Sequence, residues 1–249
     1  MILDQIVSKK YEELMNIKAP KRSLYDALSC DGISIIAEIK RASPSAGAIA
    51  KDVDAANRAR QYEAGGARAI SVVTERHFFK GDLKMLQLAK ESSNLPILRK
   101  DFMFDELQIY ESLFAGADAV LFIVSILKGN KLCDLVKLAQ DLGMETLVEV
   151  HDEDELTEAL KSDAKAIGFN NRDLKTMTVD MGRCESLIKA FCLLEPGSER
   201  KLVAESGVRT KEDVKRLQEL GFDGILIGET LMRSSNPTSL LKELLGDTR

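Results

Sequence analysis

IIAEIKRASPSAG, residues 35–47, runs from an apolar segment into a turn-rich loop and holds an acid and an amine at the junction. Glu38 and Lys40 are two positions apart, so on a β-strand both side chains project from the same face. Burying a carboxylate and an ammonium is costly unless the two pair or bind something. The pair is therefore either a structural ion pair at a strand end or part of a binding site. The rest of the chain decides between these interpretations.

The same apolar character recurs along the chain, and most apolar runs follow an amphipathic helix that ends near a glycine. Capping residues such as Asp105, Asp152 and Thr210 mark helix starts. The pattern predicts strands at 33–39, 69–74, 96–102, 119–124, 145–150, 166–171, 201–206 and 224–228. It predicts helices at 53–64, 83–90, 105–114, 130–142, 152–160, 180–191, 211–220 and 239–245.

Strands that alternate with helices fit two α/β architectures, a closed barrel and an open doubly wound sheet. Near-continuous apolar strands indicate a sheet that is covered on both faces. The even spacing, the count of eight and the length of 249 residues favour a (β/α)8 TIM barrel. The G-x-G-x-x-G fingerprint of a dinucleotide-binding sheet does not follow the first strand. We expect a single domain over residues 1–249, in which residues 1–31, with helices at 2–16 and 23–28, form an N-terminal helical extension.

The composition argues against several classes of function. A net charge of −5, with both signs well mixed, disfavours broad binding of nucleic acid or anionic membranes. No apolar run approaches the roughly 20 residues of a membrane span, and the N-terminus lacks the apolar core of a signal peptide. The two histidines stand far apart with no ligand cluster, so we expect no metal site. Reduced thiols, and hence a cytoplasmic location, are indicated by the lack of C-x-x-C spacing among Cys30, Cys133, Cys184 and Cys192.

Polar residues interrupt the apolar runs where the strands end, which is where a barrel carries its active site. Alternation along each strand selects the polar side chains that share a face with a preceding apolar residue. These side chains are Glu38, Lys40, Lys100, Glu149, Asn170 and Glu205. Three acids and two lysines at one mouth exceed what stability needs, which favours a functional site. We expect the lysines, crowded or desolvated there, to have lowered pKa values.

The ends of the last two strands carry glycines, at Ser206-Gly207 and Gly228-Glu229. Glycine lets the backbone approach an anion closely, and the N–H groups of such loops can bind phosphate. Phosphate sites after strands seven and eight recur in (β/α)8 barrels. Two ordinary turns are the alternative, but their joint placement favours a phosphorylated small-molecule ligand. We expect Glu229 to offer its N–H while its carboxylate points away.

Six motifs, EIKRASPSAG, LRKDF, LVEVH, NNRDL, AESG and IGETLM, follow the order found in the indole-3-glycerol phosphate synthase family. The chain resembles that family over nearly its whole length. The resemblance implies a (β/α)8 barrel with an N-terminal helical extension. It also implies conversion of 1-(2-carboxyphenylamino)-1-deoxyribulose 5-phosphate to indole-3-glycerol phosphate, CO2 and water in tryptophan biosynthesis. The family needs no cofactor or metal, and we infer no obligate protein partner.

The resemblance implies catalytic roles for four residues. Lys100 is the general acid that protonates the substrate ketone as the ring carbon attacks it. Lys40 holds charge near the carboxylate and phosphate, or shares the acid role in the later dehydration. Glu149 transfers a proton in the dehydration, and Glu38 orients a lysine and the substrate.

The other residues that the resemblance singles out bind the substrate. The carboxylate and hydroxyl groups are positioned by Ser43, Asn170 and Arg172, and the arginine fork suits a carboxylate. The apolar slot for the aromatic ring is formed by Phe79, Phe102 and Leu121, of which Leu121 fits a core position nearly as well. The pocket is also lined by Glu205. The phosphate is bound by Ser206, Gly207, Gly228 and Glu229.

Two alternatives compete with this interpretation. Phosphoribosylanthranilate isomerase is another phosphate-binding barrel, but it relies on a Cys and Asp pair, and the first strand here ends in Glu38 and Lys40 without a cysteine. A non-catalytic barrel that binds a phosphometabolite or a partner protein is the second. Such a barrel should have lost at least one mouth residue, and none is missing.

Overall fold

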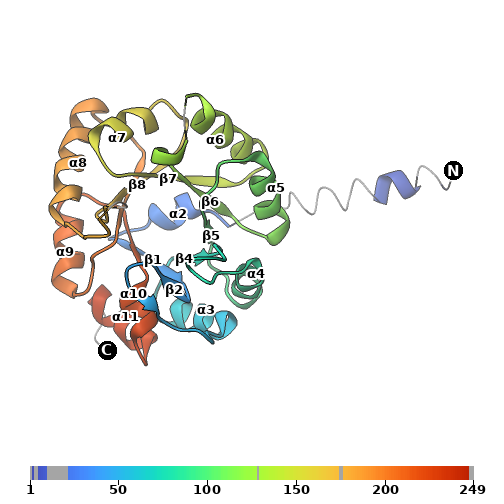
Figure 1. The fold of residues 1–249 in the computed structure, drawn as a ribbon, viewed down its shortest axis with the longest axis horizontal. Coiled ribbons are helices and arrows are strands. Elements are labelled where there is room, and N and C mark those ends of the chain that lie inside the picture. The colour runs from blue at the N-terminus through green and yellow to red at the C-terminus, as the bar shows by residue number, and fades with distance from the viewer. Residues whose placement is uncertain (1, 3–4, 10–21, 128, 174–175, 247–249) are drawn as a thin grey trace.

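Parallel strands hydrogen-bond side by side and close into an eight-stranded barrel, with a ring of helices around it (Figure 1). The structure is a computed structural model that describes residues 2, 5–9, 22–127, 129–173 and 176–246. It confirms the predicted (β/α)8 barrel. In the predicted extension, residues 2 and 5–9 are helical and α2 spans Leu24–Leu28. The rest of the helix predicted at 2–16 lies outside the described residues.

Every predicted strand is present, with ends that differ from the prediction by no more than two residues. Around the barrel the strands follow one another in the order β1 (Ser34–Ile39), β10 (Gly224–Ile227), β9 (Lys201–Glu205), β8 (Ala166–Asn170), β7 (Glu145–Val150), β6 (Ala119–Ile123), β5 (Ile97–Lys100) and β4 (Ala69–Val73). The register sets Asn170 beside Glu205 and Glu149 beside Gly168. Polar residues from β7, β8 and β9 thereby reach the same end of the barrel.

The predicted helices lie between these strands. Their bounds are α3 (Ala55–Ala64), α4 (Leu83–Ser92), α5 (Glu106–Ala115), α6 (Lys131–Asp141), α7 (Glu153–Ala159), α8 (Gly182–Leu194), α9 (Lys211–Glu219) and α11 (Pro237–Leu245). The expected caps are confirmed, since the side chains of Asp105, Asp152 and Thr210 each accept a hydrogen bond from a backbone N–H in the first turn. Gly116 ends α5 in the left-handed conformation, with φ of 89°.

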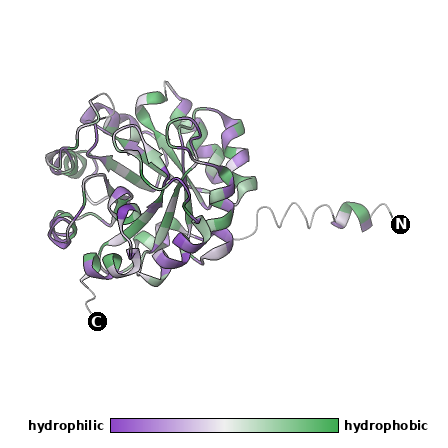
Figure 2. Ribbon diagram, turned by 60° about the horizontal axis from the view of Figure 1, so that its bottom comes forward, coloured by the Kyte–Doolittle hydropathy of each residue, from purple (hydrophilic) through white to green (hydrophobic). Residues whose placement is uncertain are grey.

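The apolar side chains form two layers, one between the strands and the helices and one inside the barrel. Figure 2 shows hydrophobic strands within helices whose outer faces are hydrophilic. The inner layer includes Ile36, Leu98, Leu147 and Val203. Each stands two positions before a polar mouth residue, so alternation along the strand turns that polar side chain inward as well.

Helix α2 closes the amino-terminal end of the barrel. Leu24 and Leu28 are buried and belong to the inner layer. The Ser34 hydroxyl donates to the Ala27 carbonyl at 2.7 Å and ties α2 to the start of β1. The carboxyl ends of the strands therefore form the end of the barrel that a ligand can enter.

Three short elements were not predicted. The loop after β1 contains a hairpin of β2 (Ala42–Ser43) and β3 (Gly47–Ala48), a 3₁₀ turn η1 (Val124–Ile126) follows β6, and α10 (Glu229–Arg233) follows β10. None is long enough for hydrophobic periodicity to reveal it. No helix within the described part of the chain is long and apolar enough to cross a membrane.

Candidate active site

A cavity of about 420 Å³ opens at the carboxyl ends of the strands. Its lining includes every residue that the sequence suggested for catalysis or binding. These residues are Glu38, Lys40, Ser43, Phe79, Lys100, Phe102, Leu121, Glu149, Asn170, Arg172, Glu205, Ser206, Gly207, Gly228 and Glu229. The cavity is thus a single site built from all parts of the barrel.

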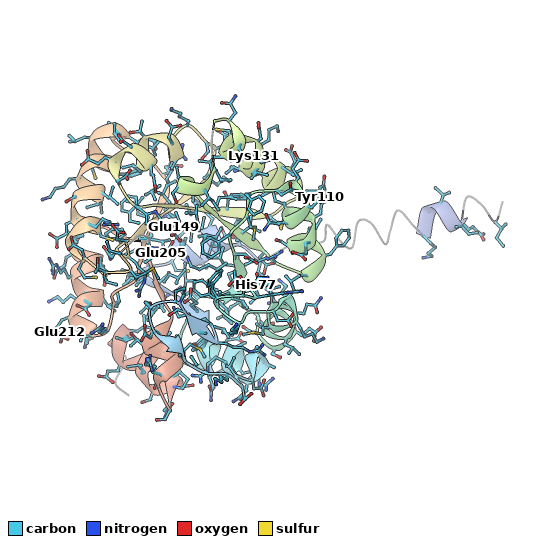
Figure 3. The ribbon with its side chains drawn as sticks, viewed as in Figure 1. His77, Tyr110, Lys131, Glu149, Glu205 and Glu212 are labelled. Carbon is cyan, nitrogen blue, oxygen red and sulfur yellow. The ribbon has the colours of Figure 1, made fainter. Side chains whose placement is uncertain are left out.

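Lys100 lies at the centre of the charged groups. Its Nζ donates to Glu149 Oε2 and to Glu205 Oε2, each at 2.8 Å, and Figure 3 shows these two glutamates near the middle of the barrel. Burial alone would lower the pKa of Lys100, but the carboxylates of Glu149, Glu205 and Glu38 together raise it above its usual value. The expected lowering of this lysine's pKa is therefore wrong. The sequence pattern places three acidic residues near Lys100, but it does not show that two of them contact the lysine directly.

Glu38 and Lys40 form a second ion pair, with 2.7 Å between Oε1 and Nζ. The predicted shared face is confirmed. Gly228 lies directly beside this pair, because a Cβ at Gly228 would overlap Glu38 Oε1 and come within 2.9 Å of Lys40 Nζ. The missing side chain at Gly228 therefore accommodates the ion pair.

Glu149 is held from three sides. Besides Lys100 on Oε2, Asn170 Nδ2 donates to Oε1 at 2.8 Å, and His151 Nε2 lies 3.2 Å from the same oxygen. Burial opposes ionisation of Glu149, but Lys100 and His151 outweigh that effect and lower its pKa. Glu149 is thus an ionised carboxylate, as a proton acceptor must be.

Glu205 differs from Glu149 although both contact Lys100. Burial raises the pKa of Glu205 to about 7, and Lys100 only partly offsets this effect, while Glu149 and Glu38 add to it. Glu205 Oε1 has no hydrogen-bond partner among the described residues, and it lies against the backbone of Gly168, where a Cβ would collide with it. The two carboxyl groups that contact Lys100 therefore differ, because the pKa of Glu149 is lowered and that of Glu205 is raised.

Asn170 joins three parts of the mouth. Its Oδ1 accepts from the Arg172 backbone N–H and from the Ser206 hydroxyl, each at 2.9 Å. Arg172 Nη1 donates to Ser45 Oγ and to the Met177 carbonyl, each at 3.0 Å. Arg172 thus links the hairpin after β1 to the loop after β8.

Two aromatic rings form one wall of the cavity. Phe79 and Phe102 have ring centroids 6.1 Å apart, and Leu121 lines the cavity while also belonging to the inner apolar layer. These residues can contact a flat apolar group.

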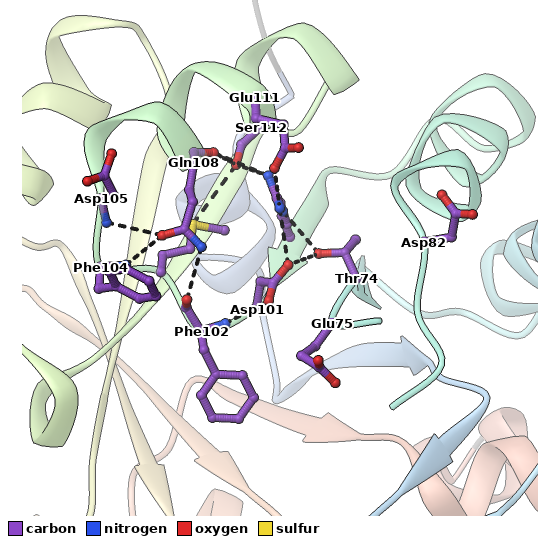
Figure 4. Close-up of polar contacts among 12 residues, drawn as sticks. Thr74, Glu75, Asp82, Asp101, Phe102, Phe104, Asp105, Gln108, Glu111 and Ser112 are labelled. Carbon is purple, nitrogen blue, oxygen red and sulfur yellow. Dashed lines mark hydrogen bonds and ion pairs between the residues drawn. The ribbon is translucent and has the colours of Figure 1, made fainter. Parts of the chain in front are cut away.

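A buried arginine, Arg99, fixes the end of β5. Arg99 donates to Thr74 Oγ1 at 3.0 Å, Ser112 Oγ at 3.0 Å, Glu111 Oε2 at 2.7 Å and Asp101 Oδ2 at 3.1 Å. Figure 4 shows the polar contacts around Asp101, with Thr74 on one side and α5 on the other. Asp101 Oδ1 accepts from the Phe102 N–H at 2.9 Å. The network therefore positions the backbone on either side of Lys100.

The loops after β9 and β10 line one side of the cavity. Ser206 and Gly207 have φ of 67° and 95°, and consecutive N–H groups in such turns can point to one anion. The Glu229 carboxylate pairs with Arg233 Nε at 2.9 Å. Arg209 and Arg233 also line the cavity, and the charge of Arg233 is balanced by Glu229.

Several lining residues were not anticipated. They include Ser45, Asp101, Met177, Val179, Arg209, Thr230 and Arg233. Arg209 follows the AESG motif and Arg233 follows IGETLM, so a search for cations next to the predicted phosphate loops would have found both. In the described ranges no group of three or more His, Cys, Asp or Glu side chains is placed to hold a metal ion. The expected absence of a metal or cofactor remains a prediction.

Comparison with known proteins agrees with the geometry. A family model described as "Indole-3-glycerol phosphate synthase" matches residues 3–244. The chain is 39% identical over 249 aligned residues to indole-3-glycerol phosphate synthase of Petrotoga mobilis, covering 100% of this chain and 98% of that protein. It is 46% identical to the enzyme of the same name from Acetivibrio thermocellus, covering 98% of each chain. The chain therefore belongs to the indole-3-glycerol phosphate synthase family.

Solved structures with similar folds are more distant in sequence. A thiamine phosphate pyrophosphorylase from Pyrococcus furiosus superposes with a TM-score of 0.65 at 17% identity, covering 90% of this chain and 97% of that one. A mutant tryptophan synthase alpha-subunit from the same organism superposes with a TM-score of 0.64 at 15% sequence identity. That match covers 86% of this chain and 98% of the other. At these low sequence identities, the structural similarity supports the fold and nothing about function.

Proposed function

We infer that this family member converts 1-(2-carboxyphenylamino)-1-deoxyribulose 5-phosphate to indole-3-glycerol phosphate, CO2 and water in tryptophan biosynthesis. The observation that carries the assignment to this site is Lys100, a partly buried ammonium between Glu149 and Glu205 beside an apolar wall. Ring closure needs an acid at a carbonyl, and dehydration needs a base and a second proton transfer. The site offers these groups within one cavity. Phosphoribosylanthranilate isomerase and a non-catalytic barrel are set aside by family membership.

In the first step we assign the acid role to Lys100. The ring carbon that bears the carboxylate attacks the ketone carbon, and a carbon–carbon bond forms as the ketone oxygen gains negative charge. Lys100 gives that oxygen a proton and becomes a neutral amine. The raised pKa keeps Lys100 protonated before the reaction. It also makes the ammonium a weaker acid, so the proton moves only as negative charge develops on the ketone oxygen.

The later steps use Glu149 and Lys40. Loss of CO2 breaks the bond between the ring and the carboxylate, and the bonding electrons restore the aromatic ring. In the dehydration the leaving hydroxyl takes a proton from the Lys40 ammonium and departs as water. Glu149 accepts the proton of the neighbouring carbon, and the electrons of that C–H bond form the new carbon–carbon double bond. Glu38 holds Lys40 in place through the 2.7 Å contact.

Binding of the substrate is divided among three regions. We assign the carboxylate to Arg172 with Ser43 and Asn170, and the aromatic ring to the wall of Phe79, Phe102 and Leu121. We assign the phosphate to the loops at Ser206, Gly207, Gly228 and Glu229. Positive φ at Ser206 and Gly207 supports the phosphate assignment.

The same proposal covers the setting of the enzyme. We propose a cytoplasmic location, one domain over residues 1–249 with residues 1–31 as its extension, and activity without an obligate protein partner or cofactor. The four cysteines are free thiols, which supports a reducing compartment.

The direct test supplies the carboxyphenylamino deoxyribulose phosphate to the purified chain and follows indole fluorescence with release of CO2. We expect turnover without added metal, and unchanged turnover with a chelator present. No product from the folded chain at any substrate concentration would overturn the assignment.

A further inference from the structure

His151 lies behind Glu149 and does not line the cavity. It follows β7 directly, and its side chain is only 9% exposed. Nε2 is 3.2 Å from Glu149 Oε1, on the opposite carboxylate oxygen from the one that Lys100 contacts. That nitrogen is close enough for an ion pair but is not aligned for a hydrogen bond.

The first turn of α7 fixes the orientation of the imidazole. Glu155 Oε2 lies 2.9 Å from His151 Nδ1 and accepts from the His151 backbone N–H at 2.8 Å. The Glu155 backbone N–H in turn donates to the capping residue Asp152 at 2.8 Å. Because a carboxylate accepts at Nδ1, that nitrogen carries a proton, and Nε2 is the nitrogen that faces Glu149.

The charges around the ring favour a second proton. The charged groups that face it are Glu149 from β7 and Glu155 from α7. Lys100 and Glu205 lie further away, beyond Glu149. Burial opposes the charged form, but the hydrogen bond to Glu155 and the attraction of both glutamates raise the pKa of His151 to about 9. The group beside Glu149 is thus an imidazolium at neutral pH.

We propose that His151 is a positioning residue whose imidazolium keeps Glu149 ionised and oriented after Lys100 has given up its proton. This rests on the proposed function, in which the Lys100 ammonium becomes a neutral amine during ring closure. Glu149 then loses the cation on Oε2 while it is still buried, and a buried carboxylate without a cation takes up a proton. His151 remains on Oε1 as the second cation, so Glu149 reaches the dehydration step as a base.

The charge on His151 can be measured without any turnover. The chain has two histidines, so a His77→Gln variant assigns the imidazole resonances in an NMR titration of the folded protein. We expect His151 to stay protonated until about pH 9 and to titrate at lower pH in Glu155→Gln, which keeps a polar partner at Nδ1 but removes its charge. A neutral His151 at pH 7 in the wild type would overturn the proposal, even if the enzyme is fully active.

The consequence for Glu149 is tested by the pH dependence of kcat in His151→Gln. We expect the midpoint of the acidic limb to rise by about 1–3 pH units, the shift that an opposite charge at this range produces, with little change in KM. His77→Gln, at an exposed position, should leave the midpoint unchanged.

A loss of activity at every pH with an unmoved midpoint would show a merely structural role and overturn the proposal. Failure of the wild type to turn over the substrate would instead contradict the proposed function, while the NMR titration would still decide the charge of His151.

Discussion

At the scale of single residues, two glycines give two buried carboxylates their room. Gly168 lies against Glu205, and Gly228 lies against the Glu38–Lys40 pair. Neither contact is visible in the sequence, where Gly228 suggested close approach of a phosphate and Gly168 suggested nothing. Neither glycine has a positive φ, so glycine is needed at these positions because a Cβ would collide with the neighbouring carboxylate.

Gly168→Ala should therefore displace the Glu205 carboxylate from Lys100. We expect kcat to fall by about 10²-fold, the cost of a misplacement near 1 Å at a catalytic group. Glu205→Asp shortens the side chain by one methylene and should partly restore kcat in the Gly168→Ala background, while it lowers kcat on its own. Strictly additive effects in this double-mutant cycle would show that the two residues do not interact.

The common placement of six polar side chains at one mouth could be predicted, because strand alternation and the position of strand ends are properties of the sequence. They are Glu38, Lys40, Lys100, Glu149, Asn170 and Glu205. Their protonation could not be predicted. Glu149 and Glu205 look alike in the sequence. In the structure, burial raises the pKa of Glu205, whereas Lys100 and His151 lower the pKa of Glu149. Those differences depend on contacts between segments about 50 to 100 residues apart.

At the scale of elements, strands and long helices were predicted within a few residues, but the short elements around the mouth were not. The hairpin of β2 and β3 and the helix α10 contain two to five residues each. They are formed by turn geometry and tertiary contacts rather than by periodicity. The mouth is therefore less predictable from the sequence than the barrel that supports it.

Arg172 connects two of these loops, and its proposed task is to bind the substrate carboxylate. Arg172→Lys keeps the charge but loses the two-pronged geometry. We expect a higher KM for ligands that carry the carboxylate, with a melting temperature close to the wild type. Ser45→Ala, which removes one of the two contacts of Nη1, is the matched control and should change KM much less. A large fall in melting temperature for Arg172→Lys would indicate that the arginine mainly holds the loops together.

At the scale of the whole molecule, the buried charges of the mouth make stability depend on pH. Glu205 and His151 both have folded pKa values above their unfolded values, about 7 against 4.5 and about 9 against 6.5. Each group therefore contributes stability that is complete below its unfolded pKa and is lost as the pH rises through its folded pKa. The unfolding free energy should fall between pH 4.5 and pH 9, by about 1–3 kcal/mol for each group.

Urea unfolding at pH 5, 7 and 9 measures this dependence. In His151→Gln the unfolding free energy should depend less on pH between about 6.5 and 9. In Glu205→Gln it should depend less on pH between about 4.5 and 7. Stability that rises with pH across the same range in the wild type would contradict these protonation states.

The central claim is that Lys100 supplies the proton for ring closure, and steady-state kinetics of Lys100→Met test it most directly. Charge develops on the ketone oxygen only as the ring closes, so this interaction should appear in kcat rather than in KM. We expect kcat to fall by about 10²–10⁴-fold with little change in KM, whereas Lys40→Met, the matched control at the same mouth, should raise KM as well as lower kcat. A near-normal kcat in Lys100→Met would contradict the account and move the acid role to Lys40.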